Sequence, residues 1–261
     1  MKKNMTNQEY HEAKGISSSD FRLLEKSPLH LDLKENFKLS GNAFDFGSAL
    51  HKLVLEPNEF NEEFAIAPDL PKNTKAGKEA YKKFLEELED KTAITSTEYK
   101  QIELMAKNVN AIAGGLLQYG EAETSYFTTD KDGIVRKCRP DYYNEDLGLV
   151  IDLKTSKDSS IYGFKKAIYE YRYHRQAAWY LDTLQLNNKN ASRFIFIVVE
   201  KTAPYMVSVY ELNQEAIEKG REDYQRLLSE YVEYLETKKA KVVKDIGLPE
   251  WAKEETELET Y

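Results

Sequence analysis

The chain has 261 residues, of which 41% are hydrophobic, so it can bury a sizeable core as a single domain over 1–261. Its formal charge of −8 argues against a protein that coats nucleic acid without specificity. A single cysteine, Cys138, excludes an internal disulfide and an all-cysteine metal cage within one chain. No apolar run reaches the length of a membrane helix and no hydrophobic segment follows the N-terminal lysines, so we expect a cytoplasmic protein with no membrane partner.

The first part of the chain is predicted to be mainly helical. Residues 1–14 are expected to be a flexible or docked tail, and the serines and aspartate of 17–20 can cap a short helix over 21–26. A stronger helix is expected from residue 43 to Pro57, because apolar residues recur there at the spacing of one helix face. His51 lies at the border of that face. Considered alone, such a histidine is more often structural than functional.

The rest of the chain alternates strands with helices. A short strand near 64–66 precedes polar helices over 76–90 and 96–118, in which we find no catalytic pattern. Further helices are expected over 161–169, 172–184 and 214–238. Further strands are expected over 124–129, 134–138, 193–200 and 205–212. The apolar strand 193–200 is expected at the centre of the sheet with the next one antiparallel to it, and the acidic segment 245–261 as a second flexible or docked tail.

Two carboxylates and a lysine are expected on one hairpin. Asp141 follows a proline, and Asp152 and Lys154 end an apolar strand. Because a strand alternates its faces, Asp152 and Lys154 project to one side and Leu153 to the other. Pairing through the turn 144–148 would bring Asp141 alongside them. Oxygen ligands from two strands suit a hard divalent cation such as Mg²⁺ or Mn²⁺. The alternative is a surface hairpin whose acids face water.

Positive charge is concentrated around this hairpin. Residues 136–175 contain nine Lys and Arg against six Asp and Glu. A basic strip beside a carboxylate site suits an enzyme that acts on a polyanion, and the alternative is that these lysines solvate helix faces. Residues 171–175 interleave aromatic and basic side chains, which favours stacking and phosphate contact with a nucleic-acid strand end. For each tyrosine, aromatic packing in the core is the alternative.

Several motifs, in this chain order, resemble those of one nuclease family. Residues 140–141 and 152–154 resemble the two halves of the PD-(D/E)xK motif, and 176–180 resemble its Q-x-x-x-Y companion motif. Residues 16–28 and 46–60 closely resemble the start of the RecE-type (exonuclease VIII) nuclease domain of phages and prophages. The resemblance implies an α/β fold with a restriction-endonuclease-like core, a mixed β-sheet flanked by helices, here with an N-terminal helical elaboration.

The resemblance also implies roles for single residues. It makes His51 a metal ligand together with Asp141, Asp152 and the main-chain carbonyl of Leu153, which would hold one or two Mg²⁺ or Mn²⁺ ions. Glu123 is either a further carboxylate of that site or a solvated strand end.

The remaining implied residues surround the metal ligands. Lys154 would position or help to deprotonate the attacking water, and Gln176 and Tyr180 would form the active-site wall, where they contact DNA or orient the lysine. DNA contacts are expected from Arg139, Lys157, Arg172, Tyr173 and Arg175.

The activity that the resemblance implies is a metal-dependent, ATP-independent exonuclease. It would digest linear double-stranded DNA from 5′ to 3′ and leave 3′ single strands for recombination by an annealing protein of the RecT kind. A ring-shaped homo-oligomer, with a tetramer favoured, would receive the DNA ends. The sequence contains no P-loop lysine motif, which is consistent with a nuclease that carries no motor. The alternatives are another PD-(D/E)xK nuclease, whether Cas4-like, helicase-associated or an endonuclease, and a non-catalytic DNA-binding module.

Overall fold

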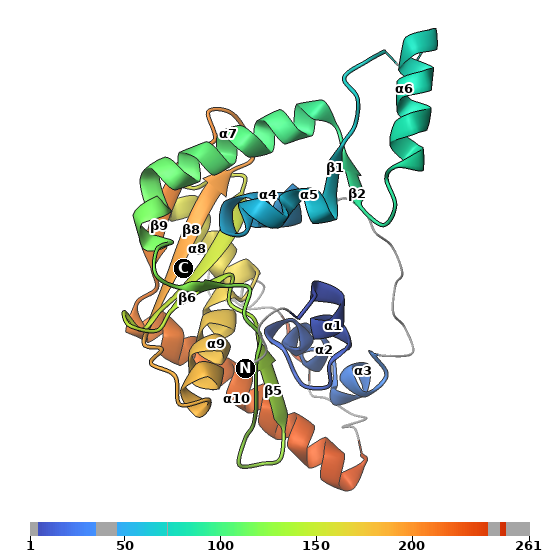
Figure 1. The fold of residues 1–261 in the computed structure, drawn as a ribbon. Coiled ribbons are helices and arrows are strands. Elements are labelled where there is room, and N and C mark those ends of the chain that lie inside the picture. The colour runs from blue at the N-terminus through green and yellow to red at the C-terminus, as the bar shows by residue number, and fades with distance from the viewer. Residues whose placement is uncertain (1–4, 35–45, 72, 240–245, 249–261) are drawn as a thin grey trace, which may run out of the picture.

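A five-stranded mixed β-sheet forms the centre of the computed structural model, which describes residues 5–34, 46–71, 73–239 and 246–248 (Figure 1). In spatial order its strands are β3 (Glu121–Ala122), β6 (Tyr142–Asn144), β7 (Leu149–Ser156), β8 (Arg193–Glu200) and β9 (Val207–Glu211). The two long strands β7 and β8 run parallel, and the other neighbours are antiparallel. The predicted antiparallel return after the apolar strand 193–200 is therefore confirmed.

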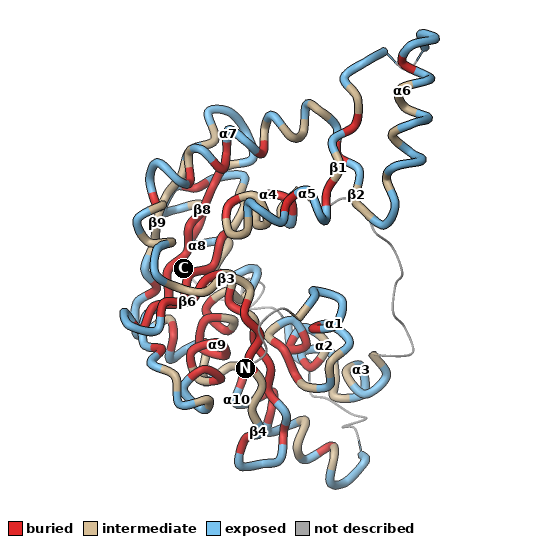
Figure 2. The backbone as a smooth tube through the Cα atoms, viewed as in Figure 1, coloured by how far each residue is buried: buried red, intermediate tan, exposed pale blue. Residues whose placement is uncertain are grey.

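Helices cover both faces of this sheet. One face packs against α8 (Ile161–Glu170), α9 (Tyr173–Leu186) and α10 (Gln214–Thr237), and the other against α4 (Phe46–Leu55) and α7 (Ser96–Ala113). Along β7, Val150 belongs to the core beneath α9 and Ile151 to the core beneath α7, as the two-residue period of a strand requires. Both faces of β7 and β8 are buried over most of their length, and β8 is accordingly mostly red in Figure 2. The predicted mixed sheet with flanking helices is confirmed.

An N-terminal helical layer packs against α9 and a separate hairpin. The layer comprises α1 (Asn7–Glu12), the 3₁₀ turn η1 (Ser18–Asp20), α2 (Phe21–Leu24) and α3 (Pro28–Asp32), and the hairpin comprises β4 (Tyr126–Thr129) and β5 (Val135–Cys138). The buried ammonium group of Lys137 donates hydrogen bonds to the carbonyl oxygens of Tyr10 and Ala13, at 2.9 and 2.6 Å. The described part of the first fourteen residues is therefore docked, as a helix that the sequence did not predict.

A second, smaller sheet lies beyond α4. After η3 (Pro57–Glu59) and α5 (Phe60–Glu63), β1 (Phe64–Ile66) pairs in parallel with β2 (Thr92–Ile94). Between these strands, α6 (Lys75–Glu86) projects away from the main sheet (Figure 1). The sequence predicted β1 but not β2.

Some predicted boundaries differ from those observed. The helix expected over 96–118 ends at Ala113, where two glycines begin the 3₁₀ turn η4 (Gly114–Leu116). Residues 43–45, where the stronger helix was expected to begin, and 249–261, most of the acidic segment, lie outside the described residues. Among the helices that the structure describes, none combines the length and the apolar character needed to cross a bilayer.

Candidate active site

Asp141 lies beside the middle of β7, as the hairpin pairing predicts. In the β6–β7 hairpin, Tyr142 pairs with Ile151. This register lets the carboxylate of Asp141 accept a hydrogen bond from the main-chain N–H of Leu153 at 2.7 Å. The Leu153 side chain packs into the core beneath α4 and α7, while Asp152 contacts α9 on the opposite face. Both faces of one strand therefore contribute to the site.

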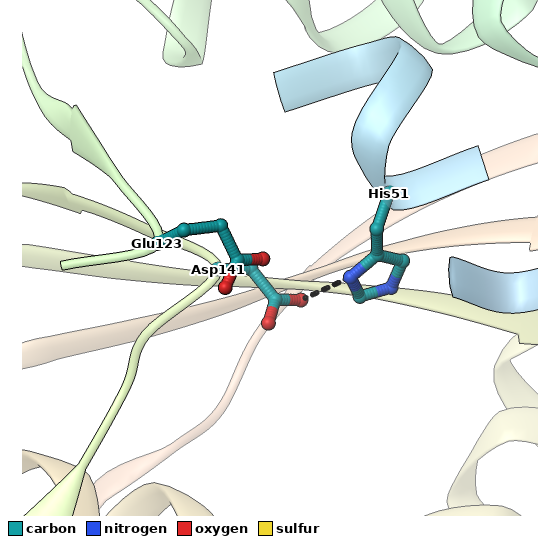
Figure 3. A group of neighbouring side chains, drawn as sticks. All are labelled: His51, Glu123 and Asp141. Atoms are coloured by element: carbon teal, nitrogen blue, oxygen red, sulfur yellow. Dashed lines mark ion pairs between the residues drawn. The ribbon is translucent and has the colours of Figure 1, made fainter. Parts of the chain in front are cut away.

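One group of side chains, the metal-ligand cluster, consists of His51, Glu123 and Asp141 (Figure 3). Each offers one ligand atom, and these atoms lie within 4.8 Å of one another. The two ring nitrogens of His51 face different oxygens: Nδ1 lies 3.4 Å from Asp141 Oδ2, and Nε2 lies 2.5 Å from the carbonyl oxygen of Leu153. A neutral imidazole has one N–H and can therefore donate to one of these two oxygens.

Glu123 is held in this cluster by backbone and side-chain contacts that the sequence did not indicate. Its φ of 47° is in the left-handed region, which costs a non-glycine residue about 1–2 kcal/mol. Its N–H donates to the carbonyl oxygen of Asp141 at 3.1 Å, and its carboxylate pairs with Arg139 Nε at 2.9 Å. Burial raises the pKa of Glu123 to about 8, with a further contribution from the charge of Asp141 and an opposing one from Arg139. Two crowded carboxylates beside an imidazole form a nitrogen and oxygen donor set that suits a divalent cation.

The second group, the lysine group, consists of Asp152, Lys154 and Gln176. Asp152 is fully buried, and its oxygens contact Lys154 Nζ at 2.5 Å and Gln176 Nε2 at 2.7 Å. Burial raises the pKa of Asp152 to about 6, although the positive charge of Lys154 opposes the rise. Burial acts to lower the pKa of Lys154, but the charges of Asp152 and Asp141 outweigh it and the pKa is raised. The lysine is therefore held as an ammonium ion in a buried position.

Sequence and structure comparisons assign this geometry to a family. The model of a family described as a PDDEXK-like domain of unknown function (DUF3799) matches residues 17–243. The chain belongs to this family. A candidate exonuclease from Eubacterium rectale has a similar fold, with a TM-score of 0.57 and 12% identity over 98% of this chain and 99% of that one. A phage related exonuclease from Haemophilus somnus 129PT has a TM-score of 0.35 and 14% identity over 79% of this chain and 100% of that one. No curated protein matches the chain in sequence.

Family membership confirms part of what the motifs implied. The restriction-endonuclease-like fold class and the PD-(D/E)xK superfamily are confirmed by the DUF3799 match and by the fold shared with the Eubacterium rectale protein. The narrower resemblance to RecE-type enzymes stays a prediction.

In this DUF3799 chain, the predicted metal ligands are divided between the two groups. His51 and Asp141 lie together as predicted, and Glu123 joins them. Asp152 lies instead in the lysine group, with both oxygens already in contact with Lys154 and Gln176. The carbonyl oxygen of Leu153 lies next to His51 Nε2, so these two predicted ligand atoms are adjacent.

Tyr180, the second residue of the Q-x-x-x-Y motif, belongs to the core. Tyr180 lies on α9 and is buried in the core that this helix shares with the sheet, where it packs against Phe194. Its hydroxyl forms a hydrogen bond with Ser18 of the N-terminal layer. Burial raises its pKa well above the usual value, with further contributions from the charges of Asp152 and Asp141. Tyr180 therefore supports the wall behind the site and links it to the N-terminal helices.

One of the five predicted DNA contacts, Arg175, is corrected by the structure. Arg175 is only 2% exposed and pairs with Glu25 at 2.8 Å and Asp223 at 2.9 Å. Arg139 pairs with Glu123 but lines the cleft at the site, so its contact with DNA stays a prediction. A basic strip read from sequence counts such residues as surface charge, because their acidic partners are distant in the chain.

The three other predicted DNA contacts lie before α8 and at the start of α9. Lys157 is exposed just after β7, and Arg172 and Tyr173 lie at the start of α9. The ammonium group of Lys154 lies 4.8 Å from the centre of the Tyr173 ring. This side of the site is therefore aromatic and basic.

A cleft of about 810 Å³ opens above the metal-ligand cluster. It is lined by the start of α1, by α4 and α5, and by residues around β3, including His51, Glu123 and Arg139. Its α4–α5 wall is acidic, and Lys52 binds three of these acids, Glu56, Glu59 and Glu63, at 2.7, 3.2 and 2.6 Å. The spacing of Lys52 and Glu56 was visible in the sequence, but the wall as a whole was not predicted.

Proposed function

We propose that the chain is a metal-dependent nuclease that hydrolyses phosphodiester bonds of DNA. The observation that carries this proposal is that two unlike groups, the metal-ligand cluster and the lysine group, meet at β7. An anionic substrate needs positive charge at its phosphate, and a hydrolytic site needs a positioned water. The two groups are arranged to meet these two needs.

His51, Glu123 and Asp141 would hold Mg²⁺ or Mn²⁺, as one or two ions, and Asp152 and the Leu153 carbonyl would complete the ligand set. Such an ion, when bound, would supply charge stabilisation at the phosphate and a more acidic water. Each oxygen of Asp152 has a second lone pair, so its contacts with Lys154 and Gln176 leave acceptor capacity for a cation.

The chain's own residues would orient the substrate and the water. Lys154, kept as an ammonium ion by Asp152, would donate to a phosphate oxygen or to the attacking water. Gln176 fixes the second oxygen of Asp152, so the carboxylate cannot rotate away from the lysine. Tyr173 would limit the approach to Lys154 from the α9 side.

The finer proposal is an ATP-independent exonuclease of the RecE type. It would digest linear double-stranded DNA from 5′ to 3′ and leave 3′ single strands for a recombination protein of the RecT kind, as phage-encoded enzymes of that type would. The motif order in the sequence supports it, and so does the name of the structurally similar Eubacterium rectale protein. A ring-shaped homo-oligomer, with four subunits favoured, would enclose the DNA end.

The test is Mg²⁺-dependent digestion of linear duplex DNA labelled separately at its 5′ and 3′ ends, beside a covalently closed circle. Asp152→Ala serves as the inactive control. Release of label from 5′ ends with an intact circle would support the exonuclease. Cutting of the circle would indicate an endonuclease instead, and no cutting with any divalent metal would contradict nuclease function.

A further inference from the structure

Two tyrosines connect the lysine group to the protein surface. The ring of Tyr173 lies under Lys154, and the ring of Tyr171 lies 5.6 Å from that of Tyr173 at an interplanar angle of 32°. Tyr173 also packs against Phe164 and Phe196, so its ring is anchored in the core. Tyr171 is 48% exposed. Core packing accounts for the inner ring but not for the outer one.

The backbone between these tyrosines is held in an unusual conformation. Arg172 has a φ of 60°, in the left-handed region that favours glycine. Its side chain pairs with Glu25 of the α2 end at 3.3 Å and lies 5.0 Å from the centre of the Tyr169 ring. Non-glycine residues in this region are found where surrounding contacts impose the conformation, often at functional sites. Here Arg172 separates the end of α8 from the start of α9 and puts one tyrosine on each side of the junction.

Positive charges accompany the aromatic rings. The charges of Lys154 and of the exposed Arg22 of α2 oppose the rise that burial causes in the pKa of Tyr173. On α8, Tyr162 is 69% exposed and has Lys166 Nζ 4.4 Å above its ring, and Tyr169 is 71% exposed. Tyr162, Lys166 and Tyr169 occur at i, i+4 and i+7 and therefore share one helix face. Exposed aromatic and basic side chains thus continue from the junction along α8.

We propose that Tyr171 and Tyr173 form a stacking platform for an unpaired DNA base beside the bond that is cut, and that the strand continues along the exposed face of α8. Successive bases stack on aromatic rings regardless of sequence, while neighbouring cations contact the phosphates. The proposal rests on the proposed nuclease function, because the platform adjoins Lys154. It adds that the site holds a single strand at the DNA end.

The acidic wall of the cleft supports this choice of side. Glu56, Glu59 and Glu63 surround Lys52 on the α4–α5 wall and neutralise its charge. Lys166 and Tyr171 are exposed outside the lining of this cleft, on α8 and at its junction with α9. A DNA strand would be repelled by the acids of the cleft and attracted to this aromatic and basic surface. The two surfaces therefore differ in the way that one-sided binding of a strand requires.

The experiment compares Tyr171→Ala and Tyr171→Phe with a matched control, Leu186→Ala. Leu186 is 47% exposed, nearly the same as Tyr171, and lies at the far end of α9, about 20 Å from Tyr173 by helix rise. The ligands are a short single-stranded oligonucleotide and a blunt duplex, each with 2-aminopurine as the terminal base, in the Asp152→Ala background to prevent cutting. Affinity and the fluorescence of the 2-aminopurine are measured together.

We expect Tyr171→Ala to weaken single-strand binding by about 5- to 150-fold and to remove the quenching of 2-aminopurine. Tyr171→Phe and Leu186→Ala should bind as the parent does, and the affinity for blunt duplex should change less. Normal binding and quenching in Tyr171→Ala would overturn the platform. If the chain with its native Asp152 still digested linear DNA, the nuclease proposal would survive that result. A chain that neither bound nor cut DNA would overturn both.

Discussion

The metal-ligand cluster and the lysine group both adjoin β7 but balance their charges differently. In the cluster, two carboxylates lie beside an imidazole, and the pKa of Glu123 is raised to about 8 by burial and by the charge of Asp141. In the lysine group, an ammonium contacts one oxygen of Asp152 and an amide contacts the other. The difference indicates that a cation stabilises the first group more than the second, in which Asp152 is already paired. Variants in the two groups should therefore affect different measurements.

The largest effect is expected from Lys154→Met. This substitution removes the positive charge that the lysine group offers to a phosphate. The digestion rate at saturating Mn²⁺ should fall by about 100- to 1,000-fold. The affinity for Mn²⁺ should stay near that of the native protein. Single-turnover digestion of end-labelled duplex measures the rate, and Lys107→Met, at an exposed site on α7, is the control. A native rate for Lys154→Met would remove the distinction between the groups.

A smaller effect is expected from Asp141→Asn, and it should appear in the affinity for the metal. It removes a charge from the metal-ligand cluster while an amide oxygen can still accept from the N–H of Leu153. The dissociation constant for Mn²⁺ should rise by about 10- to 100-fold, measured by isothermal titration calorimetry. Gln176→Leu, which changes the lysine group, should alter this constant much less. Equal losses in the two variants would mean that Asp152 is as much a metal ligand as Asp141.

The smallest predicted effect is on how the Tm depends on pH, measured in the presence of a chelator. The pKa of Glu123 is raised from 4.5 to about 8 by folding, so the folded state favours the protonated carboxyl. Its contribution to stability is present below pH 4.5 and is lost as the pH rises through 8. Asp152 acts in the same direction, but its pKa of about 6 confines its effect to lower pH. Between pH 6.5 and 8.5 the Tm should fall in the native protein and fall less in Glu123→Gln. Parallel curves for the two proteins would contradict the assignment.

Local patterns predicted the parts of the site that depend on neighbouring residues. The two-residue period of a strand put Asp152 and Lys154 on one side of β7, and the short turn after β6 brought Asp141 beside it. His51 was recognisable only through the resemblance of its helix to a known family, since a single histidine at a helix border is not diagnostic.

Long-range pairing was not predictable, and it explains the errors. Arg175 was expected to contact DNA, yet its partner Glu25 lies 150 residues away in the chain and Asp223 lies 48 residues away. The docking of α1 depends on Lys137, whose carbonyl partners are more than 120 residues away. No periodic or motif signal connects positions at such separations.

The sequence by itself determined the kinds of side chain available and the alternation of the strand that carries two of them. It also determined the helix that brings a histidine and the apolar runs that make the sheet. Only the tertiary structure decided which charges meet. It joined Glu123 to His51 and Asp141, enclosed Asp152 with Lys154, paired Arg139 with Glu123, and withdrew Arg175 from the surface. The physical reason is that charge interactions and burial depend on distances in space, which chain order does not specify.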